Sequence, residues 1–433
     1  MTKEGDAATP PSQRPLYQRI LADTRPLQES PAYRRLWIGQ SLSAVGSGMT
    51  SVAVPVQVYA LTHSSLAVGM IGLTVAVPLI GLGLVGGSIA DAFDRRKLVL
   101  LTTTLLAVVS LLFALQALLD LRQLWLLYVL IAVHSCLSAV SAPAARAFIP
   151  RLLAPDRIPA AAALSFLSFQ ISLTAGPLLA GAIIAAAGLQ TAYLVDAVSF
   201  CFAFYGVMRL PAMPPHHGGA RPGLRAVVEG LRFVRRQPVI ASALLVDLNA
   251  TIFGMPFALF PALAATHFGG GPRTVGLLYA APAIGGLICS SFSGPLSHIH
   301  RQGRAILIAL AVWGAAIAGF GATNLLWLGV TLLAIAGGAD VVNGVFRTTI
   351  IQVNTPDALQ GRVNSVGFVV DAGGPRLGDV ESGVIASVTS PAFSAVSGGI
   401  VSVVGVVLLG LLSPAFARYD ARKHVTNEPE PGI

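Results

Sequence analysis

Long apolar runs alternate with short polar connections from residue 36 to residue 415. An α-helix needs about 20 apolar residues to cross the hydrocarbon core of a bilayer. Some connections are very short, such as His63-Ser64-Ser65 and Gly188-Leu189-Gln190, so the helices they join are expected to be antiparallel neighbours. Twelve runs meet the length criterion, and we predict a membrane-spanning helix in each of 36–61, 66–91, 98–119, 124–145, 158–187, 191–209, 238–265, 274–298, 304–322, 325–348, 361–388 and 392–415.

The longest connection, residues 210–237, divides the predicted spans into six plus six. We therefore expect an all-α integral membrane protein with twelve transmembrane helices in two pseudo-symmetric six-helix bundles, 36–209 and 238–415. Polar tails precede and follow them, at 1–35 and 416–433. Within 210–237, apolar residues recur at helical spacing with the charges largely opposite them, which predicts an amphipathic helix at the membrane surface. These apolar residues are Leu224, Val227, Val228, Leu231 and Val234.

The two halves carry an internal repeat. Arg146, Ile149, Pro155 and Asp156 recur 201 residues later as Arg347, Ile350, Pro356 and Asp357. Both sets follow the fourth predicted span of their half. The match favours a duplicated six-helix unit.

Charge is scarce and unevenly placed. Only 11% of the residues are charged and 54% are hydrophobic, whereas an ordinary soluble domain has about 25% charged residues. With both tails inside, the inward segments hold 25 of the 28 Lys and Arg residues and the outward loops hold two. Because inward loops of membrane proteins are enriched in Lys and Arg, we predict that both termini are cytoplasmic. The net charge of +9 then reflects membrane topology, and no nucleic-acid partner is expected.

Catalytic and metal-binding patterns are absent from the sequence. Cys136, Cys201 and Cys289 lie inside apolar runs without CxxC spacing, so neither a disulfide framework nor a zinc site is predicted. No GxSxG, HExxH or P-loop motif occurs, so we predict that the protein is not an enzyme and binds no metal. A membrane-bound enzyme is thereby disfavoured against a transporter.

The connection after the second predicted span resembles the GxxxDxxGRR signature of the major facilitator superfamily. Gly87, Asp91, Arg95 and Arg96 match it, and Asp94 occupies the position that usually holds glycine. The resemblance implies that this loop latches the cytoplasmic side shut in the outward-open state. An alternative is that its charges only set the topology.

The fifth predicted span resembles the antiporter motif of the same superfamily. Gly176, Pro177 and Gly181 match its Gly and Pro positions, and Ala163, Ser172 and Ala180 are small residues where the motif has glycine. The resemblance indicates a helix bend and favours export. Small residues that simply allow close helix packing are the other interpretation.

Overall the sequence resembles the enterobactin-exporter-like branch of the superfamily over nearly all of 33–415, with Asp94-Arg95-Arg96-Lys97 and Gly361-Arg362-Val363-Asn364-Ser365 among the matching segments. The resemblance implies two bundles around a central cavity in the bacterial cytoplasmic membrane. It also implies proton-driven efflux of a small amphipathic molecule such as a siderophore or drug, with the proton gradient in place of a cofactor. We expect a monomer in the lipid bilayer. A facilitator or importer without proton antiport, and a non-transporting receptor, remain open.

Ionisable residues at membrane depth are costly and are therefore functional candidates. Span 361–388 holds Asp371, Arg376, Asp379 and Glu381, together with a Gly373-Gly374-Pro375 segment where we expect a local break. One interpretation is that Asp371 or Glu381 carries a proton during transport. The other is that Arg376 and the acids form a structural ion-pair network.

Further polar residues lie in predicted spans that line the cavity in this superfamily or lie beside it. The cavity candidates are Asp247, Asn249, Asp340, Asn343, His134 and Gln170. Asp196 falls in a supporting span, where a structural hydrogen bond is expected. The aromatic residues Phe253, Phe257, Phe260 and Tyr279 are candidates for an apolar cavity wall.

Overall fold

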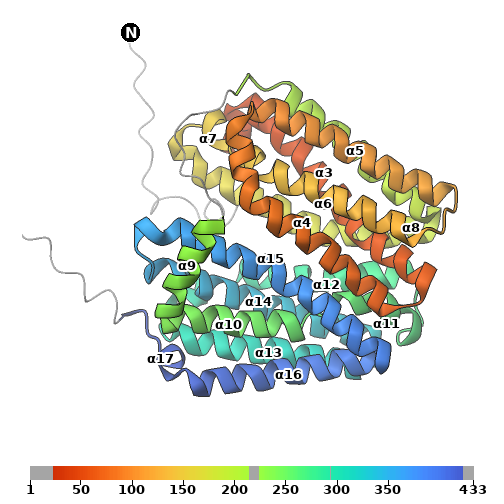
Figure 1. The fold of residues 1–433 in the computed structure, drawn as a ribbon. Coiled ribbons are helices and arrows are strands. Elements are labelled where there is room, and N and C mark those ends of the chain that lie inside the picture. Colours follow the sequence, from red (N-terminus) through yellow and green to blue (C-terminus); the bar gives the residue numbers. More distant parts are fainter. Residues whose placement is uncertain (1–22, 214–223, 293, 423–433) are drawn as a thin grey trace, which may run out of the picture.

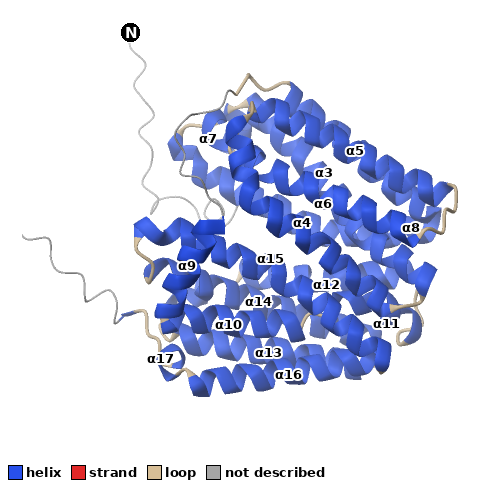
Figure 2. Ribbon diagram, in the orientation of Figure 1, coloured by secondary structure: helices blue, strands red, loops and turns tan. Residues whose placement is uncertain are grey.

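The computed structural model describes residues 23–213, 224–292 and 294–422, and in these parts of the chain the regular secondary structure is entirely helical (Figure 2). The outer parts of both predicted tails and residues 214–223 of the predicted linker lie outside the described residues.

The first bundle consists of five long helices and three short segments. The long helices are α3 (Pro31–Thr62), α4 (Ser65–Ala92), α5 (Arg95–Leu118), α6 (Leu124–Arg146) and α8 (Ile158–Met208). The short segments are α2 (Arg25–Glu29), α7 (Ile149–Leu152) and η2 (Pro155–Arg157). The polar connections supply helix caps, because Ser64 accepts a hydrogen bond from the amide of Ala67 and Asp94 accepts one from the amide of Lys97.

The second bundle follows a linker helix, α9 (Leu224–Arg236). Its long helices are α10 (Pro238–Phe253), α12 (Pro272–Ser291), α13 (Gln302–Ala322), α14 (Leu326–Val353), α15 (Asp357–Val388) and α16 (Pro391–Leu412). Shorter helices are η3 (Phe257–Leu259), α11 (Phe260–Thr266), η4 (Gly294–His298) and α17 (Pro414–Ala417). Phe416 and Tyr419, in the predicted C-terminal tail, are buried against the bundle.

Ten helical segments of the described chain are long and apolar enough to cross a membrane. One of them contains α8, whose 51 residues make it roughly 75 Å long, more than twice the ~30 Å of a bilayer core. Its backbone turns at Gly188, where φ is 82°, so α8 provides two crossings. Helix α15, with 32 residues, is also long enough to cross a membrane, although it is not among the ten apolar segments. The structure is therefore consistent with the predicted twelve crossings.

Figure 1 shows the two bundles side by side, with α9 at one end of the molecule and α11 at the other. We call these the α9 end and the α11 end.

The predicted amphipathic helix is present as α9, and one face of it packs on α15. Val234 is buried against Val363 and Val366, and Arg362 forms an ion pair with Glu229 at 3.0 Å. The other face, with Val228 and Leu231, is exposed.

The predicted break in span 361–388 is wrong. Helix α15 runs without interruption through Pro375, and its glycines serve close packing instead. A Cβ atom at Gly374 or Gly378 would overlap Thr251 of α10. The helix break lies in the span 238–265, where α10 ends at Phe253 and Gly254, Met255 and Pro256 are not helical. Pro256 has no amide hydrogen and disfavours helical geometry in the residue before it, so a break here follows from the sequence.

Candidate functional site

Backbone contacts join the two bundles along two helix pairs. Helix α4 packs on α15, where a Cβ atom at Gly69 would overlap the carbonyl group of Asp379. Helix α8 packs on α12, where a Cβ atom at Gly276 would overlap the carbonyl oxygen of Pro177. Both contacts lie in the halves of these helices nearer the α11 end. The absence of side chains at these glycines therefore lets the bundles meet directly at that end.

A cavity of about 620 Å³ lies between the bundles. It is lined from the first bundle by α3, α4, α5, α6 and α8, and from the second by α12 to α15 and the break after α10. Its polar lining residues are Ser47, Thr50, Ser51, His134, Ser135, Ser138, Gln170, Tyr279, Asp340, Arg376 and Asp379. A largely apolar wall with a few polar groups is typical of sites for small amphipathic molecules.

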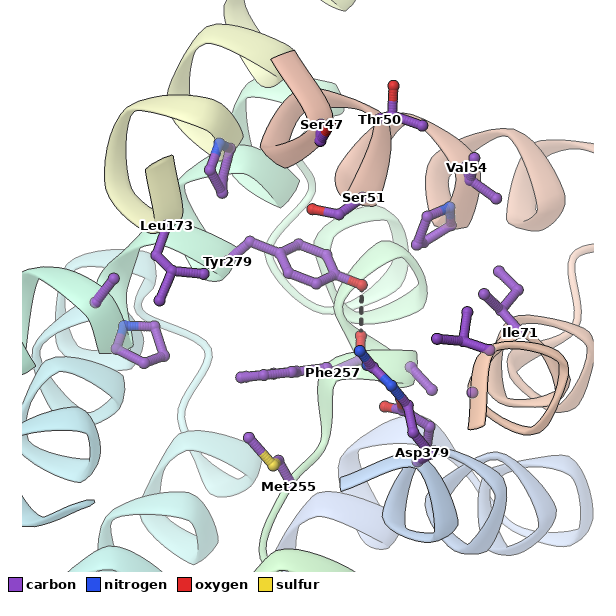
Figure 3. Close-up of a pocket in the computed structure, with 18 of the residues that line it drawn as sticks. Ser47, Thr50, Ser51, Val54, Ile71, Leu173, Met255, Phe257, Tyr279 and Asp379 are labelled. Atoms are coloured by element: carbon purple, nitrogen blue, oxygen red, sulfur yellow. Dashed lines mark hydrogen bonds and ion pairs between the residues drawn. The ribbon is translucent and has the colours of Figure 1, made fainter. Parts of the chain in front are cut away.

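The side of the cavity formed by the first bundle carries hydroxyl, amide and imidazole groups and, in the part of the chain that the structure describes, no charged side chain. Ser51 projects from α3 toward the cavity, whereas the hydroxyl group of Thr50 points away from it and donates a hydrogen bond to Asp196 (Figure 3). His134 on α6 has a buried Nε2 atom without a hydrogen-bond partner among the described residues. This side can therefore offer hydrogen bonds to a substrate.

The side formed by the second bundle is aromatic and is organised by the helix break. Tyr279 donates a hydrogen bond to the carbonyl oxygen of Phe257 at 3.0 Å (Figure 3). Trp313 donates one from Nε1 to the carbonyl oxygen of Gly254 at 2.8 Å. The bond from Trp313 satisfies a carbonyl group that the break removes from the helical pattern, and the bond from Tyr279 adds a second donor to the carbonyl group of Phe257, so both fix the segment that holds Met255 and Phe257 at the cavity.

Among the described residues, three charged side chains line the cavity, and all three belong to the second bundle: Asp340, Arg376 and Asp379. Arg376 and Asp379 lie one turn apart on α15, with Nη1 and Oδ2 3.8 Å apart. That distance is too long for a hydrogen bond. The Asp379 side chain is only 10% exposed, and its Oδ1 atom has no hydrogen-bond partner among the described residues. Asp379 is thus a buried, incompletely partnered carboxylate at the cavity wall.

Asp371 and Asp247 lie elsewhere, on either side of one arginine. Arg347 of α14 contacts Asp247 of α10 and Asp371 of α15, each at 2.7 Å from Nη1. Asn343 donates a further hydrogen bond to Asp247 at 2.7 Å. The cavity lining includes none of these four residues. The cluster therefore ties three helices of the second bundle together, and its Asp371 side chain is 55% exposed.

Of the remaining candidate residues in the predicted spans, some line the cavity and others lie outside its lining. His134, Gln170 and Asp340 line the cavity. Asn249 donates a hydrogen bond to the carbonyl oxygen of Ser402 and thereby joins α10 to α16. Glu381 is half-buried on α15, outside the cavity lining.

Asp196 is fully buried within the first bundle, where it accepts hydrogen bonds from Thr50 and Ser110 at 2.7 and 2.8 Å. Asp196 therefore makes structural hydrogen bonds, as its position in a supporting span predicts.

The loop motif after α4 makes hydrogen bonds to the end of α8 and to the start of the linker. Arg96 donates a hydrogen bond to the carbonyl oxygen of Met208 at 2.7 Å, and the amide of Arg95 donates one to Met213 at 3.2 Å. Asp94 caps α5. Gly87 and Asp91 fall in α4, but their side chains lie outside the described residues.

The motif in α8 forms close helix contacts. Gly176 packs on Gly48 of α3, and Gly181 packs on Gly276 of α12. Pro177 lies between them and lines the cavity, and α8 remains helical around it. The motif therefore lies at the contact between the bundles.

Sequence reasoning missed several cavity residues. Ser47, Thr50 and Ser51 follow the i, i+3, i+4 spacing of one helix face, which is a signal that the apolar run around them obscures. Met255 and Trp313 carry no such signal, because their position depends on the helix break.

The sequence and the fold identify the kind of protein. A family profile described as "Transmembrane secretion effector" matches residues 22–431. The chain belongs to this family of the major facilitator superfamily. The resemblance seen in the sequence is thereby confirmed. Two relatives named enterobactin exporter EntS are each 30% identical to this chain. One, from Citrobacter koseri, aligns over 388 residues, 89% of this chain and 93% of its own length. The other, from Escherichia coli, aligns over 390 residues with the same coverage.

Solved transporter structures share the fold. The nucleoside transporter NupG superposes with a TM-score of 0.68 at 13% identity, covering 92% of this chain and 100% of that one. A bacterial homologue of the iron transporter ferroportin, in an inward-facing state, gives a TM-score of 0.65 at 16% identity, covering 89% and 98%. The predicted fold class is confirmed, and the protein is a multi-pass membrane transporter of the major facilitator type.

Proposed function

We propose that this transporter exports a small amphipathic molecule, such as a siderophore, in exchange for protons. The relatives named as enterobactin exporters support a siderophore, and the cavity's combination of hydroxyl groups, aromatic rings and charges supports an amphipathic substrate. The protein works as a monomer in the bacterial cytoplasmic membrane, with both termini in the cytoplasm. Its only energy source is the proton gradient. The concentration of basic residues at the α9 end supports this orientation.

The observation that carries the proposal is the Arg376–Asp379 pair in the cavity. When Asp379 is ionised, Arg376 attracts it across 3.8 Å. When Asp379 is protonated, its carboxyl group loses the negative charge with which it can accept hydrogen bonds from a substrate in the cavity. The unpartnered Oδ1 atom is where a proton can bind without breaking a hydrogen bond. Proton and substrate thereby compete at one site, as exchange requires.

The location of Asp379 supports a link between protonation and movement. Its carbonyl group contacts Gly69 of α4, and its side chain lies beside Gly72. A change of charge on Asp379 therefore acts on the contact that joins the two bundles at the α11 end. We propose that the observed arrangement is the inward-facing state and that protonation weakens this contact.

We assign the proton to Asp379 rather than to Asp371 because their surroundings differ. Asp371 is held by Arg347 outside the cavity lining, and its side chain is mainly exposed. Glu381 also lies outside the lining. Asp371 and Arg347 belong to a structural ion-pair cluster, together with Asp247.

In the opposite, outward-facing state the loop around Asp94, Arg95 and Arg96 latches the α9 end.

The test uses inside-out vesicles with an acid interior. Enterobactin and a panel of lipophilic cations are added in turn, and the pH gradient is followed with a fluorescent indicator. Antiport predicts that a transported compound dissipates the gradient only in vesicles that contain the protein. If a compound is taken up without dissipating the gradient, the protein is a facilitator. If folded protein transports none of them in either direction, the receptor alternative gains support.

A further inference from the structure

A second recess lies on the outer surface of the second bundle, away from the central cavity. It is a groove of about 540 Å³ between α12, α13 and α14. The residues that line it are apolar except for Cys289, Arg301 and Arg304, and the apolar ones include Ile308, Val312 and Gly338. Ile308 is 61% exposed and Ile335 is 46% exposed. This face points to the hydrocarbon of the bilayer.

The groove arises from the small residues of α12 and α14. Gly285 packs on the backbone of Ala334, and Gly337 packs on the backbone of Pro282, so the two helices touch there. One turn nearer the α9 end, Gly338 faces Cys289 and no large side chain fills the space. The groove then follows α13 from Arg304 to Val312, a length of about 12 Å.

Both arginines lie at the α9 end of the groove, at the start of α13. Arg301 and Arg304 are exposed, and neither guanidinium group has an ion pair or a side-chain hydrogen bond within the described part of the chain. Asp420, the acid of the nearby C-terminal segment, is paired with Arg422 instead. The groove thus combines an apolar channel with two uncompensated positive charges where the membrane surface lies.

We infer that this groove binds an anionic phospholipid. The phosphate of the headgroup interacts with Arg301 and Arg304, and one acyl chain lies along Ile308 and Val312. Arginine recognises phosphate with several N–H donors and a permanent charge, and basic pockets between membrane helices bind acidic headgroups. Charge complementarity favours phosphatidylglycerol over a zwitterionic lipid. This inference depends only on the protein spanning a membrane, and not on the proposed proton exchange.

The test is native mass spectrometry of purified, delipidated protein. Phosphatidylglycerol or phosphatidylcholine with identical acyl chains is added at equal concentrations. We expect the first molecule of phosphatidylglycerol to bind the protein at least fivefold more tightly than the first molecule of phosphatidylcholine. In the R301Q/R304Q variant, the ratio of these two affinities should fall below twofold. Gly338→Leu should also reduce phosphatidylglycerol binding, because the new side chain fills the groove while both arginines remain.

The matched control is R232Q/R235Q, which removes two exposed arginines from α9 at the same end of the molecule. It should leave phosphatidylglycerol binding unchanged. Glycerol phosphate, which has the headgroup charge without acyl chains, should not compete. Equal binding of the two lipids by wild-type protein would overturn the inference. The inference would also be overturned if the α9 control and the groove variants lost phosphatidylglycerol binding equally, or if glycerol phosphate competed with the lipid. The unfolding temperature of each variant shows whether it is folded.

Discussion

Asp379 and Arg376 face the same cavity from one side of α15, with Oδ2 and Nη1 3.8 Å apart. The pair is close enough for charge attraction and too far apart for a hydrogen bond. The same turn of α15 packs against Gly69 and Gly72 of α4. Substrate contact, proton binding and the junction of the two bundles therefore meet at these two residues.

Arg347 should matter mainly for stability. The Arg347→Gln change leaves the buried Asp247 carboxylate without its cation, which should cost about 3 kcal/mol of unfolding free energy. Removing the other partner with Asp371→Asn should cost below about 1 kcal/mol, because that pair is largely exposed. Thermal unfolding in detergent measures both variants. Adding Asp247→Asn to Arg347→Gln should restore much of the loss, and a double variant as unstable as the sum of its parts would contradict this account.

Gly276 should be needed for the contact between the bundles. In Gly276→Ala, the new Cβ atom would overlap the carbonyl oxygen of Pro177 and push α12 away from α8. We expect at least a tenfold loss of transport. In a background without native cysteines, Val54→Cys should become more reactive toward an impermeant maleimide added at the α11 end. Gly344→Ala is the control, because a Cβ atom at Gly344 meets nothing within 4 Å. Equal behaviour of the two alanine variants would show that the contact is not critical.

Trp313 should set substrate affinity through the helix break. The Trp313→Phe change keeps the aromatic ring and removes the buried Nε1 donor to Gly254. Losing a hydrogen bond worth about 1 kcal/mol should raise the half-saturating substrate concentration roughly fivefold. Transport kinetics provide the measurement. Trp327→Phe is the control, because Trp327 is 67% exposed and should leave the kinetics unchanged. Unaltered affinity in Trp313→Phe would argue against a role for the break in binding.

The helical fold could be predicted because each crossing needs a long apolar run, and such runs are visible in the sequence. The rotation of each helix could not, because helices that are apolar on every face carry no periodic signal. Asp340 and Asp247 illustrate this limit. Both lie in spans expected to line the cavity, but Asp340 faces it whereas Asp247 faces Arg347.

The position of the helix break shows a second limit. Gly373, Gly374 and Pro375 favour a break by composition, but α15 stays helical because its glycines allow close packing on α10. Pro256, which the sequence analysis did not single out, lies in the break that forms. Which proline interrupts a helix depends on whether a neighbouring side chain, here Trp313, satisfies the carbonyl group left unbonded.

The most direct test of the central claim compares Asp379→Asn with Asp371→Asn in proteoliposomes. Two reactions are measured for each variant: substrate accumulation driven by a pH gradient, and exchange of labelled for unlabelled substrate without a gradient. The account predicts that Asp379→Asn loses gradient-driven accumulation at least tenfold while exchange continues, and that Asp371→Asn keeps both. Normal gradient-driven accumulation by Asp379→Asn would contradict it.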